Sequence, residues 1–273
     1  MRKPAAQIKI RSAVAFVLIA ALTLLCALAQ PADGLTYKTG YSSIMKLGKD
    51  IYGALKPDQR ELISAQPISI ETDSTPFVRL LYYDDEPKAV RGVWISAGFI
   101  DLVNNVAHAR AIDTKTKNYF KRYVEQLALE TGDKSLLPLP DDNNPRYWTD
   151  EMLNEQQSNF NSIVGIVVAI KLAHHYLGHY DKYKSKLTDA KGNPVPIEKI
   201  ITEKEWETAF TDGVRNALNA GCMIEGVVPF FEAFDKMKVR PPWAAYFLPD
   251  DIKFSKMRKE MERLQKLFLD GEN

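Results

Sequence analysis

Three of the four histidines of this chain, His174, His175 and His179, fall within six residues of one another. His175 and His179 are four residues apart, and in a helix this spacing places both side chains on one face. Two imidazoles so placed can bind one metal ion from a rigid support, and zinc is the ion expected there. The alternative is that these are ordinary surface or satisfied core histidines. Because imidazoles beside an apolar helix face are costly to bury without a partner, we favour a metal site.

The histidines belong to a stretch whose pattern predicts one long helix, from about Thr149 to Tyr183. Thr149 and the two acids after it form a capping start. Residues 163–172 are apolar on nearly every side except at Lys171, which is typical of a buried helix. A second helix is expected from about Thr202 to Asn219, ended by Gly221.

The region before these helices has the pattern of β-structure. Residues 77–83 and 90–96 are rich in β-branched and aromatic side chains, with turn chemistry at 84–87, so a hairpin or small sheet is expected. Further helices are expected at 42–63, with an interruption near Pro57, and at 98–129, 225–237 and 254–269. Residues 131–147 have loop composition. The predicted fold class is α+β, mostly helical, with a small sheet or hairpin and a buried two-histidine helix.

The first 29 residues have the three parts of a cleavable signal peptide. Four basic residues and no acid come first, an apolar run from Ala13 to Leu25 follows, and Ala27-Leu28-Ala29 offers a cleavage site before Gln30. A membrane anchor is the alternative, but the run is short for the ~20 residues that a bilayer crossing needs. A lipoprotein anchored at Cys26 is disfavoured by the size of Leu25. We therefore expect an exported protein, periplasmic or secreted, whose mature chain is 30–273.

The composition of the mature chain excludes some classes of function. Removing residues 1–29 takes four of the 36 basic residues and no acid, which leaves 32 against 35 and a net charge of −3. No nucleic-acid-binding footprint is present at this balance. No stable membrane span is expected after signal cleavage, and Cys222 is left without a partner for a disulfide. The length suits one domain with one core.

Three segments of the chain form a pattern when taken together: residues 93–105 (VWISAGFIDLVNN), 173–179 (AHHYLGH) and 205–234. In this order they resemble the HtpX and CAAX prenyl protease type zinc metallopeptidases, which are gluzincins. Residues 93–105 are similar to the strand-then-helix entry of that family. Residues 173–179 (AHHYLGH) are similar to its zinc-binding helix, with His175 and His179 on the two ligand positions. Residues 205–234 resemble its third-ligand helix and the packing helix behind it.

The resemblance implies a single metallopeptidase-like domain over 30–273, with an insertion at about 113–157. It also implies a zinc ion and a protein or peptide as substrate or partner. The third ligand is left open by the sequence. Strict register places Thr208 on the ligand position, and a slip of one residue places Glu207 there. We favour Glu207, with Glu205, or no third ligand, as the alternatives.

One departure from the family bears directly on activity. The family has a general-base glutamate after the first histidine, and this chain has Tyr176 there. A phenol with an ordinary pKa of about 10 is a poor base near neutral pH. We therefore expect a zinc-binding pseudoenzyme, with catalysis impaired at Tyr176. Two alternatives remain open: an active zinc-dependent endopeptidase with an unusual base, and a structural or interaction protein of the envelope that binds no metal.

Overall fold

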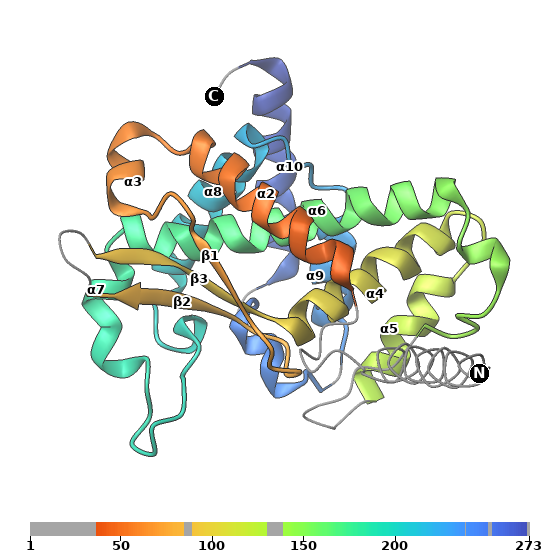
Figure 1. Ribbon diagram of the computed structural model, residues 1–273, viewed down its shortest axis with the longest axis horizontal. Coiled ribbons are helices and arrows are strands. Elements are labelled where there is room, and N and C mark those ends of the chain that lie inside the picture. The colour runs from red at the N-terminus through yellow and green to blue at the C-terminus, as the bar shows by residue number, and fades with distance from the viewer. Residues whose placement is uncertain (1–36, 85–88, 130–138, 238, 251–252, 272–273) are drawn as a thin grey trace, which may run out of the picture. The chain divides into compact units, whose positions relative to one another are not determined.

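The computed structural model describes residues 37–84, 89–129, 139–237, 239–250 and 253–271 (Figure 1). The predicted signal peptide, 1–29, lies outside the described residues, as does much of the predicted loop at 131–147. The described chain is mostly helical with one small sheet, which confirms the α+β fold class. Its helices are α2 (Lys38–Ala54), α3 (Pro57–Leu62), α4 (Ala97–Asp113), α5 (Tyr119–Leu129), α6 (Asp150–Tyr176), α7 (His179–Tyr183), α8 (Glu203–Asn219), α9 (Val227–Asp235) and α10 (Phe254–Asp270). Short 3-10 helices are η1 (Pro145–Tyr147), η2 (Lys184–Lys186), η3 (Ile197–Lys199) and η4 (Pro242–Tyr246).

The sheet has three strands, β1 (Ile68–Glu71), β2 (Val78–Tyr83) and β3 (Val90–Ser96), in the order β1-β3-β2. β2 and β3 form the predicted antiparallel hairpin, with Leu80 opposite Val93. β1 runs parallel to β3 on its other side, a pairing that the sequence did not indicate. The outer edge of β2 therefore carries no further strand in the described part of the chain.

Ser96 joins the end of the sheet to helix α4. Its hydroxyl oxygen accepts hydrogen bonds from the backbone N–H of Phe99, at 3.0 Å, and from that of Phe77, at 2.8 Å. The first bond caps α4, and the second holds the chain that enters β2. One buried serine thus fixes the direction of α4 relative to the hairpin.

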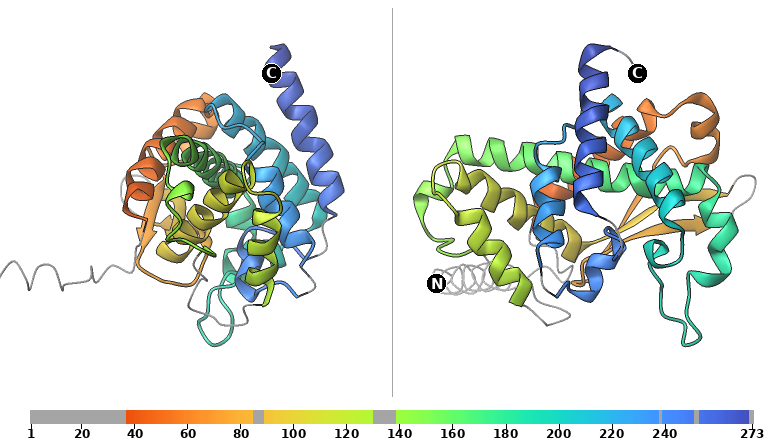
Figure 2. Two further views of the ribbon diagram at one scale, coloured as in Figure 1. Left: turned by 90° about the vertical axis from the view of Figure 1, so that its right-hand side faces the viewer. Right: turned by 180° about the vertical axis from the view of Figure 1, so that it is seen from behind.

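Helix α6 is the centre of the core, and α2, α4 and α8 all pack against it (Figure 1; Figure 2). Its start is the predicted one, because the Thr149 hydroxyl accepts a hydrogen bond from the backbone N–H of Met152. Helix α8 approaches α6 closely at Gly213, where a Cβ atom would lie 2.5 Å from the Cα of Ile170. This close contact brings the side chains of α8 next to the histidine end of α6.

No single described helix combines the length and apolarity needed to span a bilayer. Helix α6 together with residues 179–186 meets both requirements as a pair, and the pair is bent by 72°.

Candidate functional site

His175 and His179, the two histidines of the predicted metal site, and the neighbouring His174 lie where α6 ends and α7 begins. We call His174, His175 and His179 the histidine cluster. All three side chains are buried, at 0%, 1% and 8% exposure. They are grouped at the end of the central helix, where His175 contacts the middle strand of the sheet.

The single helix predicted from Thr149 to Tyr183 is wrong in its last part. Helix α6 ends at Tyr176, and Gly178 has a φ of 76°, in the left-handed region that terminates helices. His179 therefore begins a new helix, set at an angle to α6. Because the helix is interrupted between them, the expected stacking of His175 and His179 on one face does not form.

His174, and not His175, is the partner of His179. The two Nδ1 atoms lie 2.9 Å apart, which is a hydrogen-bond distance, so one ring donates its N–H and the other accepts. The Nε2 atom of His174 is buried and has no hydrogen-bond partner among the described residues. A buried N–H donor is less often left unpaired than a bare acceptor nitrogen, so Nε2 of His174 is assigned as the bare nitrogen. The proton of His174 is then on Nδ1, and His174 is the donor in the bond to His179.

His175 is held by the sheet. Its Nε2–H donates a hydrogen bond of 2.8 Å to the backbone oxygen of Gly92 in β3, and its ring packs against Tyr180. The proton on Nε2 leaves Nδ1 bare, and this atom is buried without a partner in the described part of the chain. Neither ring nitrogen of His175 is therefore available to a metal ion shared with His179. Nε2 is bonded to Gly92, and Nδ1 is buried against protein.

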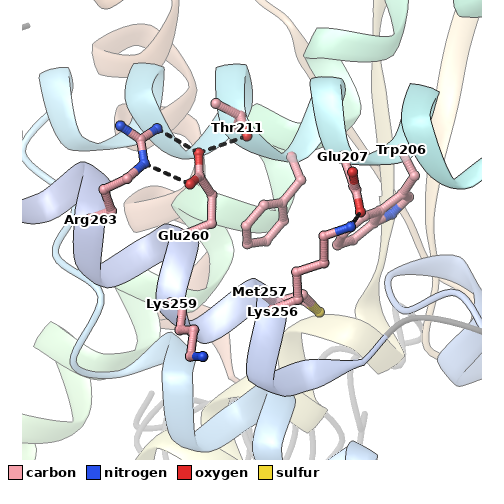
Figure 3. Close-up of a pocket in the computed structure, with 9 residues that line it drawn as sticks. Trp206, Glu207, Thr211, Lys256, Met257, Lys259, Glu260 and Arg263 are labelled. Carbon is pink, nitrogen blue, oxygen red and sulfur yellow. Dashed lines mark hydrogen bonds and ion pairs between the residues drawn. The ribbon is translucent and has the colours of Figure 1, made fainter.

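Glu207, the favoured third ligand, lies away from the histidines. It forms an ion pair with Lys256 across the α8–α10 interface. Together they line a cavity of about 430 Å³ whose walls include Trp206 and Met257 (Figure 3). Within the described ranges, no group of three or more histidine, cysteine, aspartate or glutamate side chains is placed to hold a metal ion. The residues His175, His179 and Glu207 are therefore not brought together as one set of ligands.

Glu205, the alternative third ligand, lies closer to the cluster. Its carboxylate accepts hydrogen bonds from Lys182 at 2.6 Å, from the Tyr183 hydroxyl at 2.8 Å, and from the backbone N–H of Thr202 at 2.9 Å. Burial alone would raise the pKa of Glu205, but these bonds outweigh it and lower the pKa to about 2. Its negative charge acts on both His174 and His179 and raises their pKa values against the effect of burial.

Tyr176, the residue expected at the general-base position, is partly buried and packs against the core. Its hydroxyl accepts a hydrogen bond of 2.8 Å from the side-chain amide of Asn216 on α8. Burial raises the pKa of Tyr176 far above its ordinary value, and the nearby charge of Asp212 raises it further. The phenol therefore keeps its proton at any physiological pH.

The imidazoles of the cluster are neutral at pH 7. Burial lowers the pKa of His174 well below its ordinary range and lowers the pKa of His175 to about 4. Burial also lowers the pKa of His179. Neutral imidazoles can share a hydrogen bond, and they are also the form that binds metal ions.

A buried ion pair beside the cluster was missed by the sequence analysis. Lys171 lies one turn before His174 on α6 and pairs with Glu198 of η3, and their side chains are 2% and 1% exposed. Lys171 was visible in the sequence as the one charged residue in an apolar stretch. Its partner is 27 residues away, and no local pattern connects the two.

Comparisons with known proteins add no relative. No family model, no curated protein and no solved structure matches this chain.

Proposed function

We propose that this chain is an exported, metallopeptidase-like protein that binds a protein or peptide partner without hydrolysing it. The resemblance of residues 93–105, 173–179 and 205–234 to zinc metallopeptidases supports the class. The signal-like N-terminus supports export, and Gln30 is expected as the first residue of the mature protein. The observation that argues against hydrolysis is the hydrogen bond from Asn216 to the hydroxyl of the partly buried Tyr176.

Peptide hydrolysis needs a group that accepts a proton from water. A general base works best when its pKa is close to the working pH, and such a group contributes roughly 10²–10⁴-fold to the rate. Tyr176 is unsuitable because burial raises its pKa, and its hydroxyl is already bonded to Asn216. Glu205 is unsuitable for the opposite reason, because a pKa of about 2 makes it too weak a base. Neither group beside the histidines can accept a proton from water and return it to a leaving amine.

Peptide hydrolysis tests this proposal. The mature chain, supplied with zinc, would be incubated with a denatured protein, and new termini would be sought by mass spectrometry. We expect no cleavage above the background given by the His174→Ala/His179→Ala double variant. Cleavage by the wild type that disappears in that variant would overturn the proposal and favour an active endopeptidase.

A second candidate function is zinc binding by the His174–His179 pair. Two nitrogens that share a tetrahedral zinc ion at ~2.0–2.1 Å lie about 3.3 Å apart. The observed 2.9 Å between the two Nδ1 atoms is short of this by a few tenths of an ångström, so a small rotation of either ring would admit the ion. Glu205 is the acid whose charge acts on both rings, but its oxygens are held by Lys182 and Thr202, so it would have to leave these partners to serve as a third ligand in place of Glu207.

Elemental analysis of three proteins tests the zinc candidate. After dialysis against zinc and removal of the excess, we expect bound zinc in the wild type and none in the His174→Ala/His179→Ala variant. The matched control is His175→Ala, which removes the histidine that is bonded to Gly92 and should keep its zinc. Zinc lost in the control and kept by the double variant would contradict this assignment. No zinc in any of the three would leave an interaction protein that binds no metal.

A further inference from the structure

The open edge of β2 borders a cavity of about 240 Å³. Its walls come from β2, from Tyr180 of α7, from the hairpin at 187–197 that hangs below the sheet in Figure 1, and from Tyr246 of η4. We call this cavity the β2 pocket. Lys171, the buried lysine beside the histidine cluster, reaches its floor.

The charged residues of the β2 pocket are all basic. Arg79, Lys171 and Lys184 line it, and none of its described lining residues is acidic. Lys171 is neutralised by Glu198. Arg79 and Lys184 form no ion pair with any residue that the structure describes, and Lys184 is exposed. The pocket therefore presents two uncompensated positive charges.

The guanidinium of Arg79 is held in place with an unused donor. Its central carbon lies 3.6 Å from the centroid of the Phe77 ring and 5.1 Å from that of Tyr246, so two aromatic faces fix its plane. Its Nε–H is buried and has no acceptor in the described part of the chain. A buried donor without an acceptor is unfavourable, and a planar guanidinium matches the two oxygens of a carboxylate.

The backbone beside Arg79 is also unpaired. The backbone N–H of Ser96 donates a hydrogen bond of 3.1 Å to the backbone oxygen of Phe77, the residue just before β2. In an antiparallel pair, every second residue directs its N–H and C=O groups to the partner strand, so the odd-numbered residues of β2 direct theirs to β3. The N–H and C=O groups of Leu80 and Tyr82, two partly exposed residues, therefore point to the open edge. An extended peptide could pair with these groups as an additional strand.

From these two features we propose that the β2 pocket binds the free C-terminal carboxylate of an extended peptide, with Arg79 and Lys184 as the residues that recognise the charge. The last side chain of the peptide would contact apolar wall residues, among them Leu80, Leu187 and Val195. The inference rests on the proposed function, because it names the part of a peptide partner that this protein recognises. It adds that the partner is chosen by its chain end.

A pair of synthetic probes tests the proposal. N-acetyl-Ala-Ala-Leu with a free carboxylate and the same peptide with a C-terminal amide differ only in the charged group. Their affinities for the mature protein would be measured by calorimetry at low salt. We expect the free acid to bind at least about tenfold more tightly than the amide, as for the loss of one charged hydrogen-bonded contact. We also expect its affinity to fall as salt is raised.

Variants of the two cations locate the site. Arg79→Met is expected to remove the preference for the acid, and Lys184→Met to reduce it severalfold. Lys186→Met is the matched control, because Lys186 lies on the same short helix as Lys184 but does not line the pocket, and it should bind like the wild type. Since Lys184 is exposed, its variant should fold even if Arg79→Met does not.

Equal affinity for acid and amide would overturn the carboxylate proposal, as would a preference unchanged in both Arg79→Met and Lys184→Met. Failure of both peptides to bind at millimolar concentration would also overturn it. Cleavage of either peptide by the zinc-supplied protein is a separate result, which would contradict the proposed function instead. Amide binding equal to acid binding, without cleavage, would leave the proposed function standing and remove only the inference about the chain end.

Discussion

Breaking the buried ion pair between Lys171 and Glu198 should destabilise the protein strongly. Both side chains are almost fully buried, and the second carboxylate oxygen of Glu198 has no partner among the described residues. Burial lowers the pKa of Lys171 and raises that of Glu198, and the attraction between the two charges opposes both effects. Lys171→Met keeps most of the side-chain volume and leaves Glu198 alone in the core.

The expected loss is about 3–5 kcal/mol in the free energy of unfolding, the range found when one partner of a buried pair is removed. In a chain of this size, 1 kcal/mol corresponds to roughly 2–4 °C in Tm, so Tm should fall by about 6–20 °C. Urea unfolding followed by circular dichroism at pH 7 would measure the free energy. Lys182→Met is the matched control. It breaks the exposed pair with Glu205, whose lysine is 59% exposed, and should change the stability far less.

The double variant Lys171→Met/Glu198→Leu separates the pair from its surroundings. With both charges removed, the stability should return to about the wild-type value or exceed it, because desolvation of the two ions offsets most of their attraction. The double-mutant cycle would then give a large coupling energy between the two positions. A Lys171→Met protein as stable as the wild type would refute the reasoning, since it would mean that Glu198 is not confined to a dry interior.

Three further predictions concern the histidine cluster and its supporting helices. Burial lowers the pKa of His175 to about 4 from 6.5, so below pH 6.5 the unfolded chain binds a proton that the folded chain does not. The free energy of unfolding should therefore fall by about 3 kcal/mol as the pH drops from 6.5 to 4. Urea unfolding at pH 7.5 and at pH 4.5 should show a smaller fall in the His175→Asn variant than in the wild type. Tyr176→Glu should gain no peptidase activity and should lower Tm, because the carboxylate would be buried against Asn216; zinc-dependent cleavage by this variant would show that the missing base was the only defect. Gly213→Ala should cost about 1–3 kcal/mol in unfolding experiments, because the new methyl group would lie 2.5 Å from the Cα of Ile170; an unchanged stability would mean that α6 and α8 are less closely packed.

The elements that the sequence predicted well are those whose signals are local. The β2–β3 hairpin follows from two β-branched runs around a turn, and it is confirmed. Thr149 and Thr202 were read as helix starts, and both hydroxyls cap the helices that follow. Gly221, expected to end a helix, has a φ of 88° just after α8. The parallel strand β1 was not predicted, because its four residues acquire their role only by pairing with β3.

The spacing of His175 and His179 wrongly predicted one continuous helix, although the residue that interrupts it was visible in the sequence. An i, i+4 pair shares a face only if the helix is continuous, and Gly178 stands between His175 and His179. A glycine there allows the left-handed conformation that ends α6, and this turn brings His179 to His174. The role of Glu205 also had a local signal in the sequence. Thr202 and Glu205 have the spacing of a capping box, which indicated that Glu205 closes the start of α8.

Contacts between distant segments were beyond the sequence. Gly92 bonds to His175 across 83 residues, and Asn216 bonds to Tyr176 across 40. These two bonds decide which nitrogen of His175 is free and whether Tyr176 can act as a base. Both follow from the packing of α6 between the sheet and α8, which a single sequence does not reveal.

In the histidine cluster, His174 faces His179 while His175 faces the sheet. Nitrogen-15 NMR of the labelled imidazoles, recorded with and without one equivalent of zinc, would test this arrangement. We predict that His175 carries its proton on Nε2 and is unaffected by zinc, and that any zinc-induced shift falls on the Nδ1 signals of His174 and His179. Zinc-induced shifts on His175 and His179 together, with His174 unchanged, would contradict the account and restore the metal site expected from the sequence.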